Sequence, residues 1–394
     1  MSREIWKGAE AIAEAAIRAG CRAFFGYPIT PQNEVPEYMS VRMPEVGGVF
    51  VQSESEVAAI NMVYGASASG IRCMTSSSSP GVSLKQEGIS YLAGAELPAV
   101  IVNVMRGGPG LGTIQPSQAD YFQTTRGGGN GDYRTVALAP ASIQETVDLM
   151  QEAFDIADEY RNPVVIALDG LIGQMMEPVE WTEHKGRELP AKDWAANGRH
   201  GRDHTNFVSS LLIDAPECER HNRKLMEKYE LIKAREVRYE EIECEDAEII
   251  IVAYGTTSRI AHSAVEKLRA AGEKIGLFRP ITIWPFPYDR LRELASREKV
   301  KAVLVVEMNG GQMLEDVLLG VDGQIPVEFH GRMGGEIPTV TDIENITALM
   351  LERYDGENAR KIIDEVEKIS RLEDEIEMHS IVHPLDYEDG TFRL

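Results

Sequence analysis

The sequence is poor in cysteine and lacks a long apolar run, and each shortage excludes a class of protein. Its 394 residues hold four cysteines, Cys21, Cys73, Cys218 and Cys244, and no two of them have the CxxC spacing. Their arrangement excludes a self-contained iron–sulfur cluster or zinc site of ordinary pattern and indicates a reducing compartment. No apolar run approaches the ~18 residues that a membrane span needs, and the N-terminus has no apolar signal core. We expect a soluble, cytoplasmic protein without a metal site of its own.

Positive charge is also scarce. The chain has 40 Lys and Arg against 63 Asp and Glu, which gives a net charge of −23. Nucleic acids and anionic membranes would be repelled by this charge, so neither is expected as a partner. With 394 residues, of which 43% are hydrophobic, the chain can build two domains that each have a core.

Apolar strands alternate with helical segments from residue 5 to about residue 180. Strands are expected at "CRAFFGYPIT", "EVGGVFVQ", "GIRCMTS", "PAVIVNVM", "RTVALAP" and "PVVIALD", and helices at "MSREIWKGAEAIAEAAIRAG", "SEVAAINMVYGASAS" and "PGVSLKQEGISYLAGAEL". This alternation with short loops predicts an α/β fold in which a parallel sheet is covered on both faces. Ligands of such sheets lie beyond the carboxyl ends of the strands. The loops after residues 25, 74 and 105 are therefore the expected places for a site.

Four parts are expected along the chain. Residues 1–180 form the first domain, and residues 181–244 form a polar arm with a helix near "HNRKLMEKYELIKA". Strand–helix periodicity resumes over 245–350 and predicts a second, smaller α/β domain. Residues 351–394 are acidic and are expected to form a helical tail. The arm contains histidines without metal spacing, which are expected at the surface: His184, His200, His204 and His221.

A dinucleotide-binding loop is not expected. Gly108, Gly110 and Gly112 follow a buried strand, but the GxGxxG spacing fails at Thr113, and Pro116 interrupts the segment where a helix should run. No acidic residue ends a following strand to hold a ribose.

The metal and diphosphate half of a thiamine diphosphate site is also incomplete. That half uses a GDG sequence followed by an asparagine, whereas here "LDG" at residues 168–170 lacks the first glycine. Asn197 follows, but the polar segment before it is interrupted by Pro178 and Pro190. We interpret this match as accidental and expect the diphosphate half on another chain.

The stretch "VQSESEVAAINMVYG" places Glu54 and Glu56 before a helix rich in small residues. Ser53 to Glu56 has the pattern of a capping box, in which a Ser and a later Glu satisfy free backbone donors, and acidic groups suit the positive end of the helix dipole. The aminopyrimidine half of a thiamine diphosphate site instead needs a glutamate at a strand-to-helix junction with a glycine along the helix. Gly65 lies nine residues after Glu56, so Glu56 is favoured as catalytic and Glu54 as structural.

Four segments together carry a resemblance to a known family. They are residues 24–38 "FFGYPITPQNEVPEY", 51–66 "VQSESEVAAINMVYGA", 75–98 "TSSSSPGVSLKQEGISYLAGAELP" and 104–123 "VMRGGPGLGTIQPSQADYFQ". With "RPITIWPFP" and "VVEMNGG" from the second domain, the chain resembles the alpha subunit of 2-oxoacid:ferredoxin oxidoreductases, nearest to the branched-chain (2-oxoisovalerate, or 3-methyl-2-oxobutanoate) type. The resemblance covers about residues 5–350. It implies a pyrimidine-type thiamine-diphosphate-binding domain and a smaller transketolase C-terminal-like α/β domain.

The resemblance also implies roles for particular residues. Glu56 would contact N1′ of the aminopyrimidine and favour the imino tautomer that removes the thiazolium C2 proton, which is acid–base catalysis relayed through the cofactor. Thr30 and Arg106 would hold the carboxylate of the 2-oxoacid, since an arginine at a strand end presents a planar fork to it. The residues expected to line the cofactor are Glu56, Tyr27, Pro28 and Ser79. The loop that contains Ser79, residues 76–81, could equally cap a helix.

The implied function is one subunit of an acyl-CoA-forming oxidoreductase that decarboxylates a 2-oxoacid and reduces ferredoxin. Thiamine diphosphate would be shared with a beta subunit that carries the diphosphate site and Mg²⁺, and 4Fe-4S clusters would lie on partner subunits. No Lys or Arg lies between Gly107 and Thr125, which favours 2-oxoisovalerate over 2-oxoglutarate because the latter needs an extra cation. Three alternatives stay open: 2-oxoglutarate as substrate, a non-oxidative thiamine-dependent transferase, and a scaffold subunit whose glutamates only cap a helix. The Gly-rich loop over 126–134 is expected at a subunit interface.

Overall fold

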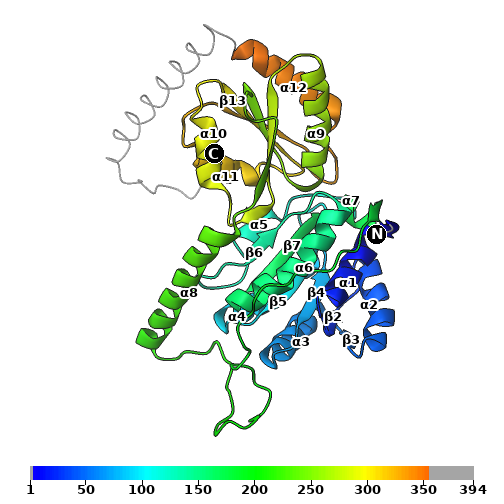
Figure 1. The fold of residues 1–394 in the computed structure, drawn as a ribbon, viewed down its shortest axis with the longest axis vertical. Helices are drawn as coiled ribbons and strands as arrows, with labels where there is room; N and C mark the ends of the chain where they lie inside the picture. The colour runs from blue at the N-terminus through cyan, green and yellow to red at the C-terminus, as the bar shows by residue number, and fades with distance from the viewer. Residues whose placement is uncertain (1–2, 355–394) are drawn as a thin grey trace, which may run out of the picture. The chain divides into compact units, whose positions relative to one another are not determined.

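The chain forms two main sheets, shown with their helices in Figure 1. The computed structural model describes residues 3–354, so most of the acidic tail predicted over 351–394 lies outside the described residues. The described chain up to Asn345 forms one compact unit. Within residues 3–354, no helix is both long enough and apolar enough to cross a membrane.

The first sheet has seven strands in the order β12-β6-β7-β5-β4-β2-β3. All neighbours are parallel except β12, which is antiparallel to β6. The strands are β2 (Ala23–Gly26), β3 (Val49–Gln52), β4 (Cys73–Ser77), β5 (Ala99–Met105), β6 (Val136–Leu138), β7 (Pro163–Asp169) and β12 (Thr282–Trp284). Every residue of β4, β5 and β7 is buried, as the apolar runs predicted for strands covered on both faces.

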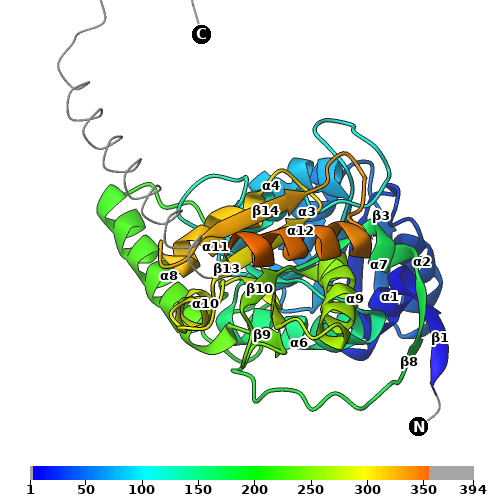
Figure 2. The same cartoon turned by 90° about the horizontal axis from the view of Figure 1, so that it is seen from above.

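Helices cover both faces of this sheet. They are α1 (Gly8–Arg18), α2 (Glu34–Glu45), α3 (Glu56–Ala68), α4 (Ser79–Gly94), α5 (Tyr121–Thr125), α6 (Ile143–Tyr160) and α7 (Gly170–Gln174). Figure 2 shows α3 and α4 packed together on one face and α1 and α6 on the other. The predicted strand–helix alternation and the α/β class are confirmed.

The second sheet has the order β14-β13-β10-β11-β9 and is parallel except for β9. Its strands are β9 (Tyr239–Ile242), β10 (Ile249–Val252), β11 (Ile275–Pro280), β13 (Ala302–Glu307) and β14 (Val327–Gly331). The helices that follow them in the chain are α9 (Gly255–Ala270), α10 (Tyr288–Ala295), α11 (Gln312–Val321) and α12 (Val340–Arg353).

The two sheets are joined by an exchange of short strands and by buried hydrogen bonds. β12 lies in the sequence between strands of the second sheet but pairs with β6 of the first. Gln118 adds two bonds, since its N–H donates to Met308 O at 3.0 Å and its Nε2 donates to Tyr254 O at 2.7 Å. The domain boundaries expected at residues 180 and 244 stay predictions.

The N-terminus differs from the predicted helix. Residues Glu4–Lys7 form strand β1, which pairs antiparallel with β8 (Met176–Val179), and helix α1 begins only at Gly8. A Cβ at Gly8 would lie 2.0 Å from Ile172 O, so the helix start is packed directly against the backbone of α7. The remainder of α1 is buried on nearly all sides, because α2 and α6 both pack against it.

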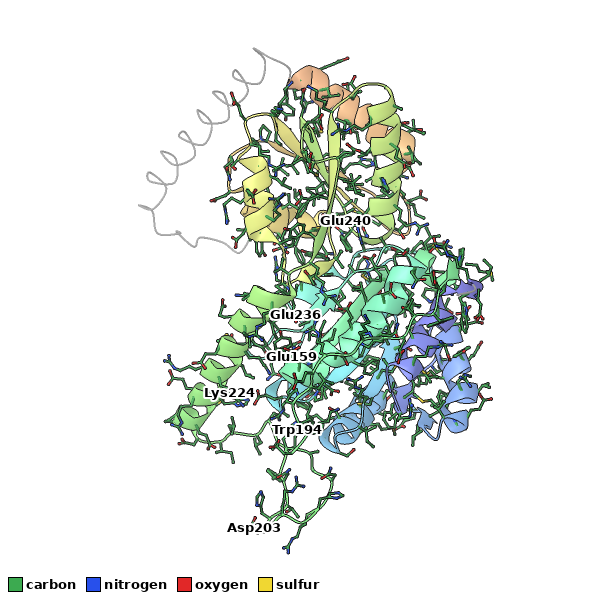
Figure 3. All side chains as sticks on the ribbon, in the orientation of Figure 1. Glu159, Trp194, Asp203, Lys224, Glu236 and Glu240 are labelled. Atoms are coloured by element: carbon green, nitrogen blue, oxygen red, sulfur yellow. The ribbon has the colours of Figure 1, made fainter. Side chains whose placement is uncertain are left out.

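The polar arm is irregular from residue 180 until α8 (Ala215–Glu236). Arg187 ties it to the core through Glu159 of α6 at 2.7 Å and Glu236 of α8 at 2.6 Å, two residues labelled in Figure 3. Trp194 lies under the guanidinium of Arg161, which is 4.5 Å from the ring centroid. These contacts attach the arm to the sheet's helices at separate points.

Candidate functional site

Glu56 is the first residue of α3, at the junction with β3. The capping box predicted for Ser53 and Glu56 is wrong in its residues, because Ser55 is the N-cap and its Oγ accepts from Ala58 N at 3.2 Å. Ser53 instead donates to Gly26 O at 3.1 Å. Glu56 is only 6% exposed, yet its carboxylate accepts no hydrogen bond from the described residues. Since Ser55 caps the helix, the Glu56 carboxylate is free for another role.

The carboxylate of Glu56 lies against the first turn of α4. A Cβ added at Gly81 would be 2.7 Å from Glu56 Oε1 and 2.1 Å from Ser77 Oγ, so only glycine permits this approach. The helix predicted after residues 76–81 is present but begins earlier, at Ser79, and its N-cap residue Ser78 makes no side-chain cap bond with the described residues. The hydroxyls of Ser77 and Ser78 are both buried and have no partner within residues 3–354. Both hydroxyls lie at the carboxyl end of β4, and that of Ser77 adjoins Gly81 together with the Glu56 carboxylate.

Arg106 follows directly after β5, at the carboxyl end of the strand, and is only 8% exposed. Its Nη1 donates to Thr30 O at 2.9 Å and its Nη2 donates to Leu111 O at 3.0 Å. Its Nε is buried and has no partner in the part of the chain that the structure describes. The two carbonyls fix the plane of the guanidinium, and Nε–H remains available as a donor.

Ser79 connects Arg106 to two polar residues that the sequence analysis did not select. The backbone N–H of Arg106 donates to Ser79 Oγ at 3.0 Å, and the Ser79 hydroxyl donates to Asp120 Oδ2 at 2.5 Å. Asn103 Nδ2 donates to the same carboxylate oxygen at 3.0 Å. Burial raises the pKa of Asp120 despite these bonds. A polar residue within the apolar run "AVIVNVM" was the sequence signal for Asn103.

A buried lysine is a second omission. Lys85, in the second turn of α4, is 0% exposed, and its Nζ donates to Thr75 Oγ1 at 2.8 Å and to Ser76 O at 3.1 Å. Burial lowers its pKa to about 7, and the negative charge of Glu56 opposes that decrease. Lys85 therefore changes charge near neutral pH.

The loop after β2 brings some expected residues together and leaves others apart. Thr30 approaches Arg106 through its carbonyl, while its hydroxyl accepts from Asn33 Nδ2 at 3.4 Å. Tyr27 and Pro28 are exposed, and their side chains make no hydrogen bond with the other expected site residues in the described chain. Their roles stay predictions.

A cavity of about 370 Å³ lies beside Thr30. Its apolar lining residues are Pro31, Ile114, Pro116 and Leu171. Its charged lining residue, Glu34, is paired with Lys7. The carbonyl of Thr30 bonds Arg106, so an arginine and an apolar cavity adjoin the same loop.

Three segments considered in the sequence analysis are held by protein contacts. Asp169 caps α7 through Leu171 N at 3.0 Å and accepts from Thr256 Oγ1 at 2.9 Å. In the Gly-rich loop, Arg126 pairs with the buried Asp316 at 2.9 Å. Asn197 is the asparagine of the incomplete diphosphate pattern. Its side-chain oxygen accepts a hydrogen bond from Arg202 of the arm at 3.1 Å. Residues 3–354 contain no cluster of three or more His, Cys, Asp or Glu arranged to hold a metal.

Two family models match the chain. One, described as "Pyruvate flavodoxin/ferredoxin oxidoreductase, thiamine diP-bdg", matches residues 14–243. The other, described as "Pyruvate:ferredoxin oxidoreductase core domain II", matches residues 247–343.

Curated relatives cover most of the chain. The ketoisovalerate oxidoreductase subunit VorB of Methanothermobacter marburgensis is 53% identical over 343 residues, which are 87% of this chain and 96% of that protein. The 2-oxoglutarate synthase subunit KorA of Methanothermobacter thermautotrophicus is 38% identical over 370 residues, 87% of this chain and 98% of that protein.

Solved structures share the fold. A 2-oxoglutarate:ferredoxin oxidoreductase from Magnetococcus marinus, with 2-oxoglutarate, coenzyme A and succinyl-CoA bound, has a TM-score of 0.79 and 25% identity. The match covers 88% of this chain and 65% of that one, so this chain spans less than two thirds of that neighbour's length. A split-gene transketolase with a TM-score of 0.52 and 16% identity, covering 92% of this chain and 97% of that one, shares the fold alone.

Proposed function

Because this chain belongs to the pyruvate flavodoxin/ferredoxin oxidoreductase family, we propose that it binds the pyrimidine of thiamine diphosphate and the carboxylate of a branched-chain 2-oxoacid in a multi-subunit oxidoreductase. In the proposed reaction the 2-oxoacid and the thiol of CoA become acyl-CoA, carbon dioxide and a proton. The two electrons released pass singly through iron–sulfur clusters to ferredoxin. Thiamine diphosphate supplies, when bound, the electron sink that decarboxylation of a 2-oxoacid requires.

The observation that carries this proposal is the first turn of α4, which contacts the Glu56 carboxylate and the backbone of Arg106. Gly81 lies against the carboxylate of Glu56, and Ser79 bonds the backbone of Arg106 at 3.0 Å. One turn of backbone thus contacts the buried Glu56 carboxylate directly and buried Arg106 through its main chain, and the Arg106 Nε has no partner among the described residues. A group that exchanges a proton and a group that binds an anion are the two that this subunit must supply.

The residues around Glu56 fit an aminopyrimidine. The ring offers nitrogen acceptors and an amino donor, and at the end of β4 the buried hydroxyls of Ser77 and Ser78 have no partner among the described residues. A hydroxyl both donates and accepts, so each can serve either kind of ring atom. The Glu56 carboxylate would accept a hydrogen bond from N1′–H, and glycine at position 81 allows the carboxylate to approach the backbone of α4 closely.

Arg106 is proposed to bind the substrate carboxylate. Its Nη atoms are held by the carbonyls of Thr30 and Leu111, which orients the guanidinium before substrate arrives. The unpartnered Nε–H and the remaining hydrogens on its Nη atoms then face a carboxylate as a fork. Pre-orientation of this kind reduces the entropy lost on binding.

A branched aliphatic substrate is supported by what adjoins Arg106. Ile114 and Pro31 line the neighbouring 370 Å³ cavity. Arg126, the nearest cation in the sequence after Arg106, is paired with Asp316 at 2.9 Å and is not available for a distal carboxylate. The relative that is 53% identical is named for ketoisovalerate, whereas the 2-oxoglutarate relative is 38% identical.

The diphosphate, Mg²⁺ and 4Fe-4S clusters are assigned to partner subunits. Asp169, the carboxylate of the incomplete diphosphate pattern, is committed to α7 and Thr256. The curated relatives are themselves named as subunits. We therefore propose a beta subunit with the diphosphate site, at least one iron–sulfur subunit, and ferredoxin as the electron acceptor.

The test compares Glu56→Gln with Glu54→Gln in the complex purified with its native partners. With CoA, thiamine diphosphate and 2-oxoisovalerate, reduction of a viologen dye should fall by about 100-fold or more in Glu56→Gln, the scale of lost acid–base catalysis. Glu54→Gln should keep its rate, since Glu54 is exposed. Activity retained by Glu56→Gln, in an assembled complex, would refute the catalytic assignment.

The same preparation separates the alternatives. Faster turnover with 2-oxoglutarate than with 2-oxoisovalerate would refute the branched-chain assignment. A complex without the visible absorption of iron–sulfur clusters would instead indicate the non-oxidative transferase.

A further inference from the structure

Lys85 is a buried cation without a counter-ion at salt-bridge distance. Its ammonium bonds Thr75 Oγ1 and Ser76 O, both neutral groups of β4. No carboxylate of the described residues lies within 4 Å of its Nζ in an ion pair. An ammonium has three donors, so one hydrogen is not accounted for by these bonds. Burial of an unpaired charge is costly, which calls for a reason other than stability.

Lys85 lies on the face of α4 that the Glu56 carboxylate contacts. Gly81 and Lys85 are four residues apart in the helix and therefore lie on one face. The Glu56 carboxylate lies against Gly81, 2.7 Å from the position of an added Cβ, and α3 packs along α4. The two charges interact, because Glu56 opposes the decrease in the pKa of Lys85 that burial causes.

Other ionisable groups do not compete for Lys85 in the described chain. The neighbouring residues of β4 are neutral serines and Thr75, and β5, which also packs on α4, has no ionisable side chain. β7 contributes Asp169, whose oxygens are bonded to α7 and to Thr256. Glu56 is the charged group that acts on Lys85.

We propose that Lys85 is a positioning residue for the reaction proposed above: its buried ammonium attracts the Glu56 carboxylate and holds it directed toward the pyrimidine of the cofactor. This inference rests on the proposed function. When Lys85 is charged, the Glu56 carboxylate is held in place to accept a hydrogen bond from N1′–H. When Lys85 is neutral, this attraction is lost and the Glu56 carboxylate is less well oriented toward N1′.

The experiment measures the dissociation constant of thiamine diphosphate by titration calorimetry, together with kcat/KM, in the assembled complex from pH 6 to pH 8.5. Because the pKa of Lys85 is about 7, it is charged at the lower end and neutral at the upper end. At pH 6, Lys85→Met should weaken cofactor binding and lower kcat/KM by about tenfold or more, the effect of one buried opposite charge. At pH 8.5 the variant and wild type should converge.

Two further variants separate this role from a structural one. Lys85→Gln keeps a donor for β4 but removes the charge, and it should behave as Lys85→Met does. Lys228→Met removes another buried lysine, one that contacts Glu96 through Nζ at 3.4 Å, and it should leave the pH dependence of both quantities unchanged. A loss of equal size at every pH, or none, would overturn the proposal.

If neither Lys85 variant assembles, the pH dependence of cofactor binding by wild type tests the proposed role of Lys85. The cofactor affinity of wild type should decrease as the pH rises through 7, and a flat profile would contradict the inference. The proposed function is tested separately: if Glu56→Gln is inactive while Lys85→Met matches wild type at pH 6, only the role of Lys85 fails. If Glu56→Gln is active, the proposed function fails.

Discussion

Replacement of Lys85 by methionine should stabilise the folded chain at neutral pH while it impairs the reaction. Methionine has a similar length and no charge, so it fills the space between α4 and β4 without the cost of a buried ammonium. The expected result is a gain in the free energy of unfolding together with a loss of function. Such opposition between stability and activity is common where a buried group serves a site.

The magnitude follows from the pKa of Lys85, which burial lowers from its ordinary value of 10.5 to about 7. Between these values the unfolded chain binds the proton and the folded chain does not, so the stability of wild type rises by about 1.4 kcal/mol for each pH unit. Below pH 7 the folded chain bears the full free-energy cost of the buried ammonium, about 5 kcal/mol. The variant leaves Thr75 Oγ1 and Ser76 O without this donor, which offsets about 1–3 kcal/mol. The net gain below pH 7 is therefore about 2–4 kcal/mol.

Urea unfolding of the purified chain at pH 6, 7.5 and 9, followed by tryptophan fluorescence, measures this gain. The difference between Lys85→Met and wild type should be greatest at pH 6 and should shrink steadily toward pH 9. Equal stabilities at pH 6 would mean that the folded chain bears no charge cost at this position. A difference that is the same at all three pH values would mean that packing, and not ionisation, sets it.

Two other substitutions test the geometry around Glu56. Gly81→Ala places a Cβ 2.1 Å from Ser77 Oγ and 2.7 Å from Glu56 Oε1. Viologen reduction should therefore fall by about 100-fold, as expected for a displaced catalytic group. In the control, Gly65→Ala in α3, the added Cβ meets no described atom within 4 Å, and the free energy of unfolding in urea should rise by up to about 1 kcal/mol. An active Gly81→Ala enzyme would show that the carboxylate need not lie there. Ser55→Ala removes the cap of α3 and should lower the free energy of unfolding by about 1 kcal/mol. The variant should retain far more activity than Glu56→Gln. Unchanged stability would mean that Ser55 is not the cap.

The sheet could be predicted from the sequence because its central strands are buried on both faces. β5 and β7 are continuous apolar runs, and this pattern distinguishes them without knowledge of their neighbours. β1 was mistaken for helix because its residues, Glu4–Lys7, become a strand only by pairing with β8, more than 160 residues later in the chain. The pairing of β12 with the first sheet could not be predicted from the sequence for the same reason. Its three residues are too few to show a strand pattern.

Part of the candidate site could also be predicted from the sequence. The spacing from Glu56 to Gly65 identified a helix start, but the choice of Ser55 as cap depends on backbone angles that sequence does not give. Lys85 was missed because a lysine within a helix is ordinarily exposed. A signal was present nevertheless: Gly81, Lys85 and Gly88 share one face of α4, and a Cβ at Gly88 would lie 2.5 Å from Ile60. Glycines flanking a lysine on one face indicate close helix contact around it.

The exchange of strands bears on the order in which the chain can fold during synthesis. The two family models divide near residue 245, yet β9 precedes this point and pairs with β11, while β12 follows it and pairs with β6. A nascent chain that ends there already contains β9, an edge strand of the second sheet, before the rest of that sheet is made. It still lacks β12, which covers the edge of the first sheet. Until residue 284 has left the ribosome, the open edge of β6 can pair with other chains. Genes that split or shuffle the two halves must therefore move both strands or replace them.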